Sequence, residues 1–225
     1  VLIDYNPRHL YRKLIPQEAE MEEFLSTVTT REWHMRQDYD GDPAAATREL
    51  QALHPGKESL IAAYYDRFDE MLDHASPPMA ALVERLGDAG VPLYLLSNAP
   101  GFLDRWLRGP AQAKHPFVGR FRDFIVSGHV GCWKPDAAIF ELTCRTGGFS
   151  PQDAVFIDDV VANVDGARAT GMSGIHHRSA VETVAELQAV SMDKLLAAVT
   201  TEVRTTPDFG PVTDVGTTLD RSVEE

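Results

Sequence analysis

The sequence is poor in cysteine and has no long apolar run. Its 225 residues include two cysteines, Cys132 and Cys144, too few for a disulfide framework or a cysteine-rich zinc site. We therefore interpret both as small apolar residues. No apolar run approaches the ~20 residues that a membrane-spanning helix needs, and no signal peptide is visible at Val1. These absences predict a cytoplasmic protein with no membrane partner.

Positive charge is also scarce. Lysine and arginine total 21 residues against 34 aspartates and glutamates, so the formal net charge is −13. Such a surface repels nucleic acid and anionic membranes, because both bind basic surfaces. It does not exclude a small anionic substrate, since a few local cations or a bound metal can outweigh the global field inside a pocket. The predicted partner is a small molecule, and the oligomeric state stays open.

Two patterns of apolar residues divide the chain. Between residues 6 and 76 the apolar spacing is helical and is broken at Pro16 and at two glycine–proline turns, which predicts about four short helices and no strand. After residue 79 short apolar runs alternate with helical patterns, which predicts a doubly wound parallel α/β sheet. The predicted strands are residues 91–96, 124–127, 154–158 and 173–176, and the predicted helices are 79–89, 136–147, 163–170 and 181–199.

The predicted organisation follows from this division. Residues 1–8 and 77–199 are expected to form the α/β core, and residues 9–76 an inserted helical-bundle cap. Residues 200–225 are rich in Thr, Asp, Pro and Gly and lack apolar periodicity, so we expect a disordered acidic tail there.

Polar residues follow three of the predicted strands. Ser97 and Asn98 follow the first strand, Lys134 lies after the second, and Asp158 and Asp159 end the third. Ligands of parallel α/β sheets gather at the carboxyl ends of the strands. Paired carboxylates need a cation, and hard oxygen ligands suit Mg²⁺. A hydroxyl and a lysine bind a phosphoryl group, so the set predicts phosphoryl transfer.

The order and spacing of these residues carry a resemblance. Ser97, then Lys134-Pro135, then Asp158-Asp159 with Asn163 resemble motifs two to four of the haloacid dehalogenase superfamily. The string VFIDDVVANVDGARATGM is similar to the fourth motif of the subfamily with a helical cap, which includes bacterial glucose-1-phosphate phosphatases and the phosphatase domain of soluble epoxide hydrolase. The resemblance covers about residues 1–190. It implies a Mg²⁺-dependent phosphomonoester hydrolase that forms an aspartyl-phosphate, with a small phosphorylated metabolite such as a sugar phosphate as substrate.

The resemblance also implies a role for each residue. Ser97 would hydrogen-bond the phosphoryl group, Asn98 would line the pocket, and Lys134 would neutralise the nucleophile and the substrate. Asp159 would ligate magnesium directly, Asp158 would act through a bound water, and Asn163 would support the metal. These implied site residues are Ser97, Asn98, Lys134, Asp158, Asp159 and Asn163.

The start of the chain departs from the family pattern. Val1-Leu2 match the two apolar residues that end the family's first motif, which places the nucleophilic aspartate four positions before Val1. Asp4 does not match, because no strand precedes it. We therefore expect a truncated chain that lacks the central strand and leaves two strand edges bare. Such a chain is expected to be inactive and poorly soluble.

Two alternative functions remain open. A 2-haloacid dehalogenase uses the same fold without a metal, but similar dehalogenases carry serine and asparagine where Asp158 and Asp159 stand. A catalytically inactive phosphate-binding or interaction protein is the other alternative, supported by the missing nucleophile.

Several further polar residues are candidates for smaller roles. The His176-His177 pair follows the last strand and is interpreted as structural rather than metal-binding. Candidates for substrate contact in the cap are Trp33, His34, Gln37 and Asp38. Candidates for the rim of the pocket, close in sequence to the missing motif, are Tyr5, Arg8 and His9.

Overall fold

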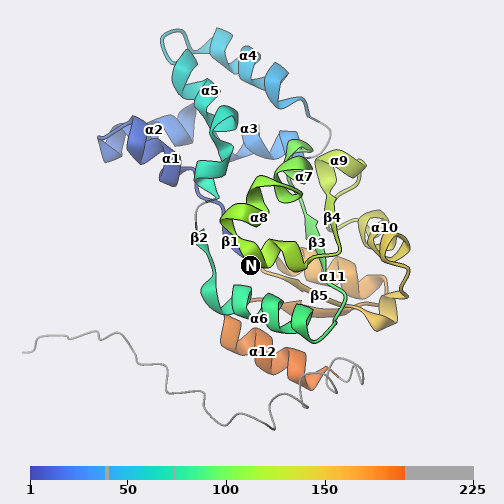
Figure 1. Cartoon of the computed structure of the whole chain (residues 1–225). Coiled ribbons are helices and arrows are strands. Elements are labelled where there is room, and N and C mark those ends of the chain that lie inside the picture. Colours follow the sequence, from blue (N-terminus) through green and yellow to red (C-terminus); the bar gives the residue numbers. More distant parts are fainter. Residues whose placement is uncertain (39–40, 73, 191–225) are drawn as a thin grey trace, which may run out of the picture.

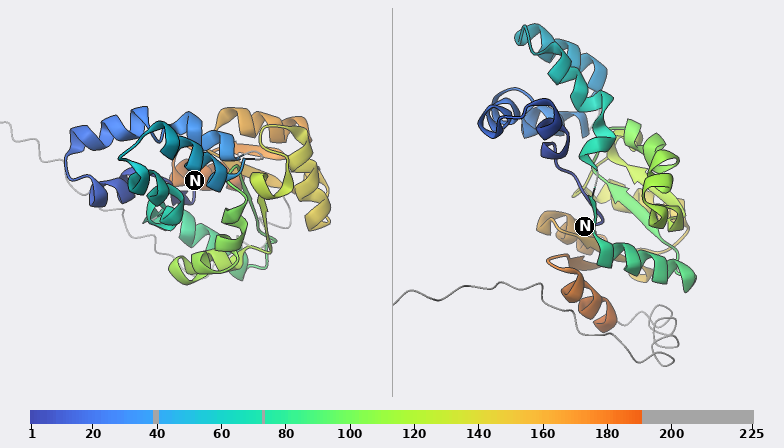
Figure 2. Two further views of the ribbon diagram at one scale, coloured as in Figure 1. Left: turned by 90° about the horizontal axis from the view of Figure 1, so that it is seen from above. Right: turned by 60° about the vertical axis from the view of Figure 1, so that its left-hand side comes forward.

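The computed structural model describes residues 1–38, 41–72 and 74–190, and it shows a helical N-terminal segment joined to an α/β core (Figure 1). The helices of the segment are α1 (Arg8–Leu14), α2 (Glu18–Thr27), α3 (Arg31–Met35), η1 (Arg36–Asp38), α4 (Pro43–Leu53), α5 (Glu58–Asp66) and η2 (Phe68–Met71). Figure 2 shows this segment projecting from one end of the core, with α12 (Ala180–Ala189) at the opposite end. The predicted helical character of the segment is thus confirmed.

The prediction that this segment contains no strand is wrong at its end. Two short strands, β1 (Ile3–Asp4) and β2 (His74–Ala75), pair antiparallel where the chain leaves the core and returns to it. Pairing satisfies backbone N–H and C=O groups that two separate crossings would leave without partners. The two connections between segment and core are therefore held together by backbone hydrogen bonds.

Side-chain caps and apolar packing explain the helices of the segment. The Thr30 hydroxyl accepts a hydrogen bond from the Trp33 amide at 3.1 Å, and Asp42 accepts from the amides of Ala44 and Ala45, so α3 and α4 begin at capped positions. The buried side chains of the segment include Leu10, Tyr11, Met21, Phe24, Ile61, Tyr64 and Met71. These side chains belong to one apolar cluster that continues into the α/β core, where it includes Leu103, Phe117 and Phe124.

The core alternates strands and helices, as the sequence predicts. Its elements are α6 (Pro77–Asp88), β3 (Tyr94–Ser97), α7 (Phe102–Leu107), α8 (Pro110–Lys114), η3 (Pro116–Arg120), β4 (Asp123–Val126), α9 (Ser127–Val130), α10 (Ala137–Gly147), η4 (Pro151–Asp153), β5 (Val155–Asp158), α11 (Val161–Ala169), β6 (Ser173–His176) and α12. All four predicted strands are present. The first begins three residues later than predicted, and Pro92, which cannot donate to a strand ladder, lies in the part left out. The predicted last helix beyond residue 190 and the tail 200–225 lie outside the described residues.

The strands form two small parallel pairs rather than one continuous sheet. β3 pairs with β4, with Ser97 opposite Val126, and β5 pairs with β6, with Asp158 opposite His176. Among the described residues no strand pairing joins β3 to β5. Both strands instead line one cavity of about 1570 Å³. The fold is thus mixed α/β with small parallel sheets.

The cysteines behave as small apolar residues. Cys144 is buried with Ile139 and Phe140 in the apolar cluster around α10, Cys132 packs at its edge, and both thiols are free. Burial raises the pKa of both thiols, which disfavours the reactive thiolate. Within the described ranges, every helix is too short or too polar to cross a bilayer.

Candidate active site

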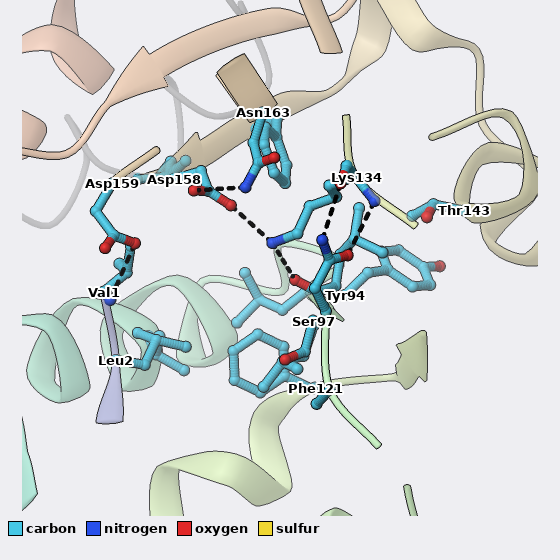
Figure 3. A pocket seen from close by; sticks show the side chains of 18 of the residues that line it. Val1, Leu2, Tyr94, Ser97, Phe121, Lys134, Thr143, Asp158, Asp159 and Asn163 are labelled. Atoms are coloured by element: carbon cyan, nitrogen blue, oxygen red, sulfur yellow. Dashed lines mark hydrogen bonds and ion pairs between the residues drawn. The ribbon is translucent and has the colours of Figure 1, made fainter. Parts of the chain in front are cut away.

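A buried ion pair lies at the carboxyl ends of the strands. The Lys134 ammonium donates to Asp158 Oδ2 at 2.7 Å and to the Leu96 carbonyl oxygen at 3.0 Å. The two side chains are 9% and 7% exposed, and the Phe156 ring lies 5.5 Å from the ammonium. A buried carboxylate is stable only with such a partner. The structure therefore brings the end of β3, the end of β5 and the Lys134 loop together (Figure 3).

Asn98 holds the Lys134 loop in place. Its amide nitrogen donates to the Lys134 carbonyl oxygen at 2.9 Å, and its amide oxygen accepts from the Lys134 backbone N–H at 2.9 Å. The loop also packs on α11 at Gly166, where a Cβ would lie 2.3 Å from the Pro135 carbonyl oxygen. Asn98 lines the cavity as predicted, but its hydrogen bonds show that it also positions the loop that carries Lys134.

Asp158 and Asn163 are in direct contact. Asp158 Oδ1 accepts from the Val160 amide at 2.8 Å and from the Asn163 side-chain amide at 3.1 Å. Both oxygens of Asp158 are thus engaged, one by Lys134 and one by the first turn of α11. Lys134, Asp158 and Asn163, which the sequence predicts to belong to one site, thus lie together.

Asp159 points away from this group. Its side chain is 61% exposed, and its Oδ1 atom lies 3.6 Å from the Val1 amino group. Figure 3 shows the carboxylate directed toward Val1 rather than toward Lys134. The expectation that Asp158 and Asp159 converge on one point is therefore not met in this arrangement, because Asp158 is held by Lys134 and Asn163 while the Asp159 side chain is exposed and faces Val1.

The oxygen donors match magnesium in kind. No cluster of three or more His, Cys, Asp or Glu side chains occurs in the part of the chain that the structure describes. Mg²⁺ does not need one, because it keeps several waters and binds through one or two carboxylates and substrate phosphate oxygens. Asp159, with its exposed carboxylate, and the Asp158–Asn163 pair supply hard oxygen donors of this type.

Ser97 completes the group on the side of β3. It is the last residue of that strand and lines the cavity. Figure 3 shows it beside the Leu96 carbonyl oxygen that Lys134 contacts, with its hydroxyl directed away from the ammonium. An ammonium, a buried carboxylate and a nearby hydroxyl thus lie at the ends of β3 and β5, and these are groups that can bind a phosphoryl group beside a divalent cation.

Residues of the helical segment and of its connections to the core also line the cavity. These are Tyr5, Arg31, His34, Met35, Asp38, Phe68 and Leu72. Of the candidates from the sequence, Tyr5, His34 and Asp38 thus face the cavity. Met35 and Phe68 were missed, because apolar residues at helical spacing look like core residues.

The remaining candidates have structural partners. Trp33 packs on Tyr64, and Gln37 donates to the Trp33 carbonyl oxygen at 3.3 Å. Arg8 pairs with Glu22, and His9 with Asp4. In the histidine pair, His177 bonds the Thr183 hydroxyl at 2.8 Å and His176 lies 3.2 Å from the Asp159 carbonyl oxygen, so each ring has a partner within the fold.

Burial changes the protonation of two cavity residues in opposite directions. It raises the pKa of the Asp38 carboxyl to about 7 and lowers the pKa of the His34 imidazole to about 4. The His34 Nε2 atom lies 3.7 Å from Asp38 Oδ1. Near neutral pH the imidazole is uncharged and the carboxyl is partly protonated.

We expect Asp38→Asn to become progressively more stable than the wild type as the pH rises from about 4 to about 7. In that window the folded state keeps the Asp38 proton and the unfolded state loses it, so the wild type loses up to about 1.4 kcal/mol of stability per pH unit through this group. His34 has the opposite effect. Both the wild type and the variant lose stability through this residue as the pH falls from 6.5 toward 4, because the unfolded state takes up a proton on the imidazole before the folded state does.

Urea unfolding at pH 5 and pH 8 measures this difference. The stability of Asp38→Asn relative to the wild type should rise by about 1–3 kcal/mol between the two pH values, allowing for the partial exposure of the carboxyl. Asp66→Asn, at an exposed position of α5, is the matched control. A difference that does not change with pH would contradict the raised pKa of Asp38.

Comparisons with known proteins agree with this geometry. The model of the haloacid dehalogenase-like hydrolase family matches residues 2–171. A sesquiterpene phosphatase of Aspergillus oryzae is 26% identical over 190 residues, which cover 84% of this chain and 90% of that protein.

Two solved structures share the fold. A haloacid dehalogenase family enzyme of Bacteroides thetaiotaomicron, in complex with magnesium and inorganic phosphate, has a TM-score of 0.56 at 21% identity over 78% of this chain and 88% of that one. A dehalogenase in an intermediate complex has a TM-score of 0.55 at 20% identity over 77% of this chain and 78% of that one. At these identities the two structures show the fold alone.

Proposed function

Because the chain belongs to the haloacid dehalogenase-like hydrolase family, we propose that it is a Mg²⁺-dependent phosphomonoester hydrolase of a small phosphorylated metabolite. The observation that carries the proposal is the buried Lys134–Asp158 pair at the end of β5, which also contacts the Leu96 carbonyl oxygen beside Ser97 at the end of β3. We propose further that residues 9–76 act as a cap over a core of residues 1–8 and 77–199.

Each site residue has a role in this proposal. Lys134 and Ser97 hold the phosphoryl oxygens and stabilise the charge that develops on them. Asn98 keeps Lys134 in position through its two backbone hydrogen bonds. Asp159 binds the metal directly, and Asp158 and Asn163 support it. Magnesium, when bound, supplies positive charge to the phosphoryl group.

The nucleophile in this proposal is an aspartate on a strand that precedes Val1 and lies between β3 and β5. The cavity supports this placement, because β3 and β5 both line it and do not pair with each other. The carboxylate oxygen attacks phosphorus, the bond to the leaving alcohol breaks, and the alcohol takes up a proton. Water then hydrolyses the aspartyl-phosphate and releases inorganic phosphate.

The relatives support the reaction and leave the substrate open. The Aspergillus relative is a phosphatase of sesquiterpenes, and the Bacteroides enzyme holds magnesium and phosphate. The sequence prediction of a sugar phosphate and the terpenoid substrate of the relative are two different chemical classes.

Dehalogenation is the second candidate, because a solved dehalogenase shares the fold. The acid pair Asp158-Asp159 argues against it, since two carboxylates near the site repel a haloacid carboxylate. The third candidate, a phosphate-binding protein without catalysis, is tested by the same assay.

We expect the full-length protein to release phosphate from p-nitrophenyl phosphate with Mg²⁺, to stop when EDTA removes the metal, and to release no halide from 2-chloropropionate. Phosphate and halide are measured in parallel, with and without Mg²⁺. Halide release in EDTA would favour the dehalogenase. Phosphate binding without turnover of either substrate would favour the binding protein.

A further inference from the structure

Exposed apolar side chains gather on one cavity. Tyr5 is 37% exposed, Met35 38% and Val160 48%, and all three line the cavity between the helical segment and the core. Large apolar side chains that stay accessible inside a concave site are typical of a binding surface for apolar ligands. We call four cavity-lining residues the cap wall: His34, Met35 and Phe68 in the helical segment, and Tyr5 on the connection that leads into it.

Stacked aromatic rings form most of the cap wall: His34 and Phe68 are buried, and Tyr5 and Met35 stay partly exposed. The Tyr5 ring stacks on His34 at 5.1 Å and on Phe68 at 5.6 Å between centroids. The Tyr5 hydroxyl is engaged by the Tyr64 hydroxyl, and His34 Nδ1 lies 3.1 Å from the Tyr65 hydroxyl. A polyol would need several free donors and acceptors here, because its own hydroxyls would otherwise lose hydrogen bonds to water.

The wall also carries little charge. The buried His34 imidazole stays neutral near pH 7, and Asp38 is partly protonated there. Among the described residues of the helical segment that line the cavity, Arg31 is the cationic one, and its side chain is exposed. The neutral wall thus differs from the charged group formed by Lys134, Asp158 and Asp159.

Contacts with the core place the wall over the carboxyl ends of the strands. The Ser127 hydroxyl, directly after β4, donates to the Asp38 carbonyl oxygen. The Phe68 ring lies 5.1 Å from the ring of Phe102, on the helix that follows β3. Figure 1 shows α3 next to α7 and α9, which follow these strands. A phosphoryl group held by Lys134 would therefore have its leaving group beside the wall.

From this geometry we infer that the cap wall binds an apolar leaving group, so that the substrate is a phosphomonoester of a hydrophobic alcohol rather than of a polyol. The inference rests on the proposed function for the position of the phosphoryl group. It adds the chemical class of the substrate, which neither the reaction type nor the core residues determine.

Calorimetric titration of two non-hydrolysable phosphonates into the full-length protein with Mg²⁺ tests the inference. Octylphosphonate should bind at least about tenfold more tightly than 2,3-dihydroxypropylphosphonate, because its methylene groups are transferred from water to the apolar surface of the cap wall. Met35→Gln, which keeps the side-chain length but adds a polar amide, should remove most of this preference. Met35→Leu, which keeps an apolar side chain, should retain it.

The outcomes separate this inference from the proposed function. Equal affinity for the two phosphonates, or a preference for the dihydroxypropyl compound, would overturn the apolar assignment. A preference for octylphosphonate that Met35→Gln leaves intact would also overturn it, because the chain would then lie elsewhere. The expected affinities in a protein that releases no phosphate from any ester would support the wall and contradict the phosphatase.

Discussion

A strand that carries an aspartate, joined in front of Val1, is expected to raise the phosphatase activity of the 225-residue chain. β3 and β5 face one cavity without pairing to each other, and a strand between them would satisfy both edges. Each buried backbone group left unpaired costs about 1–3 kcal/mol, so the shorter chain should also be less soluble and less stable. The extended chain should release phosphate at least about 10³-fold faster, because it alone carries the nucleophile.

The matched control is the same extension with asparagine in place of the aspartate. It should restore solubility and cooperative unfolding without restoring turnover, which separates the structural role of the strand from its chemistry. Phosphate release and the urea midpoint are measured for all three proteins. Turnover by the 225-residue chain itself would show that the nucleophile has been placed wrongly.

Lys134→Met is expected to reduce both activity and stability. The variant removes the cation that holds the phosphoryl group, for which a loss of about 10²–10³ in kcat is expected. It also leaves Asp158, 7% exposed, without its ammonium partner, and breaking a buried pair in this way costs about 3–5 kcal/mol.

The double variant Lys134→Met/Asp158→Asn separates the two effects. It removes both buried charges, so most of the lost stability should return while activity stays low. Urea unfolding and steady-state kinetics of the single and double variants form the test, with the exposed pair variant Arg178→Met as the control. A double variant with near-wild-type kcat would exclude Lys134 from the reaction.

The sequence predicts the core well because local patterns determine its elements. The four strands are short apolar runs bounded by turns, and the predicted fourth strand, residues 173–176, coincides with β6. The helices between β3 and β4 were not predicted, because α7, α8 and η3 are short and are interrupted by Gly109 and Pro116. Whether the strands form one sheet depends on pairing across the chain, which local patterns do not contain.

The candidate site could be predicted only in part. The rule that strand ends share one edge brings Ser97, Lys134 and Asp158 together. The hydrogen bond from Lys134 to the Leu96 carbonyl oxygen was not predicted, because a backbone acceptor is not recognisable from the residue type. The direction of the Asp159 side chain, toward Val1, is a tertiary feature that local sequence patterns do not contain. The cap wall was not recognised as a surface, because its apolar residues look like the interior of a helical bundle.

The central claim is that Ser97, Lys134 and the acid pair surround one phosphoryl group beside a divalent cation. A crystal structure of the full-length protein with Mg²⁺ and orthovanadate tests it most directly. We predict vanadate within hydrogen-bond distance of Ser97 Oγ and Lys134 Nζ, with the metal bound to Asp159, whose carboxylate turns toward Asp158. Vanadate bound elsewhere, with Asp159 and Lys134 facing separate clefts, would contradict the account.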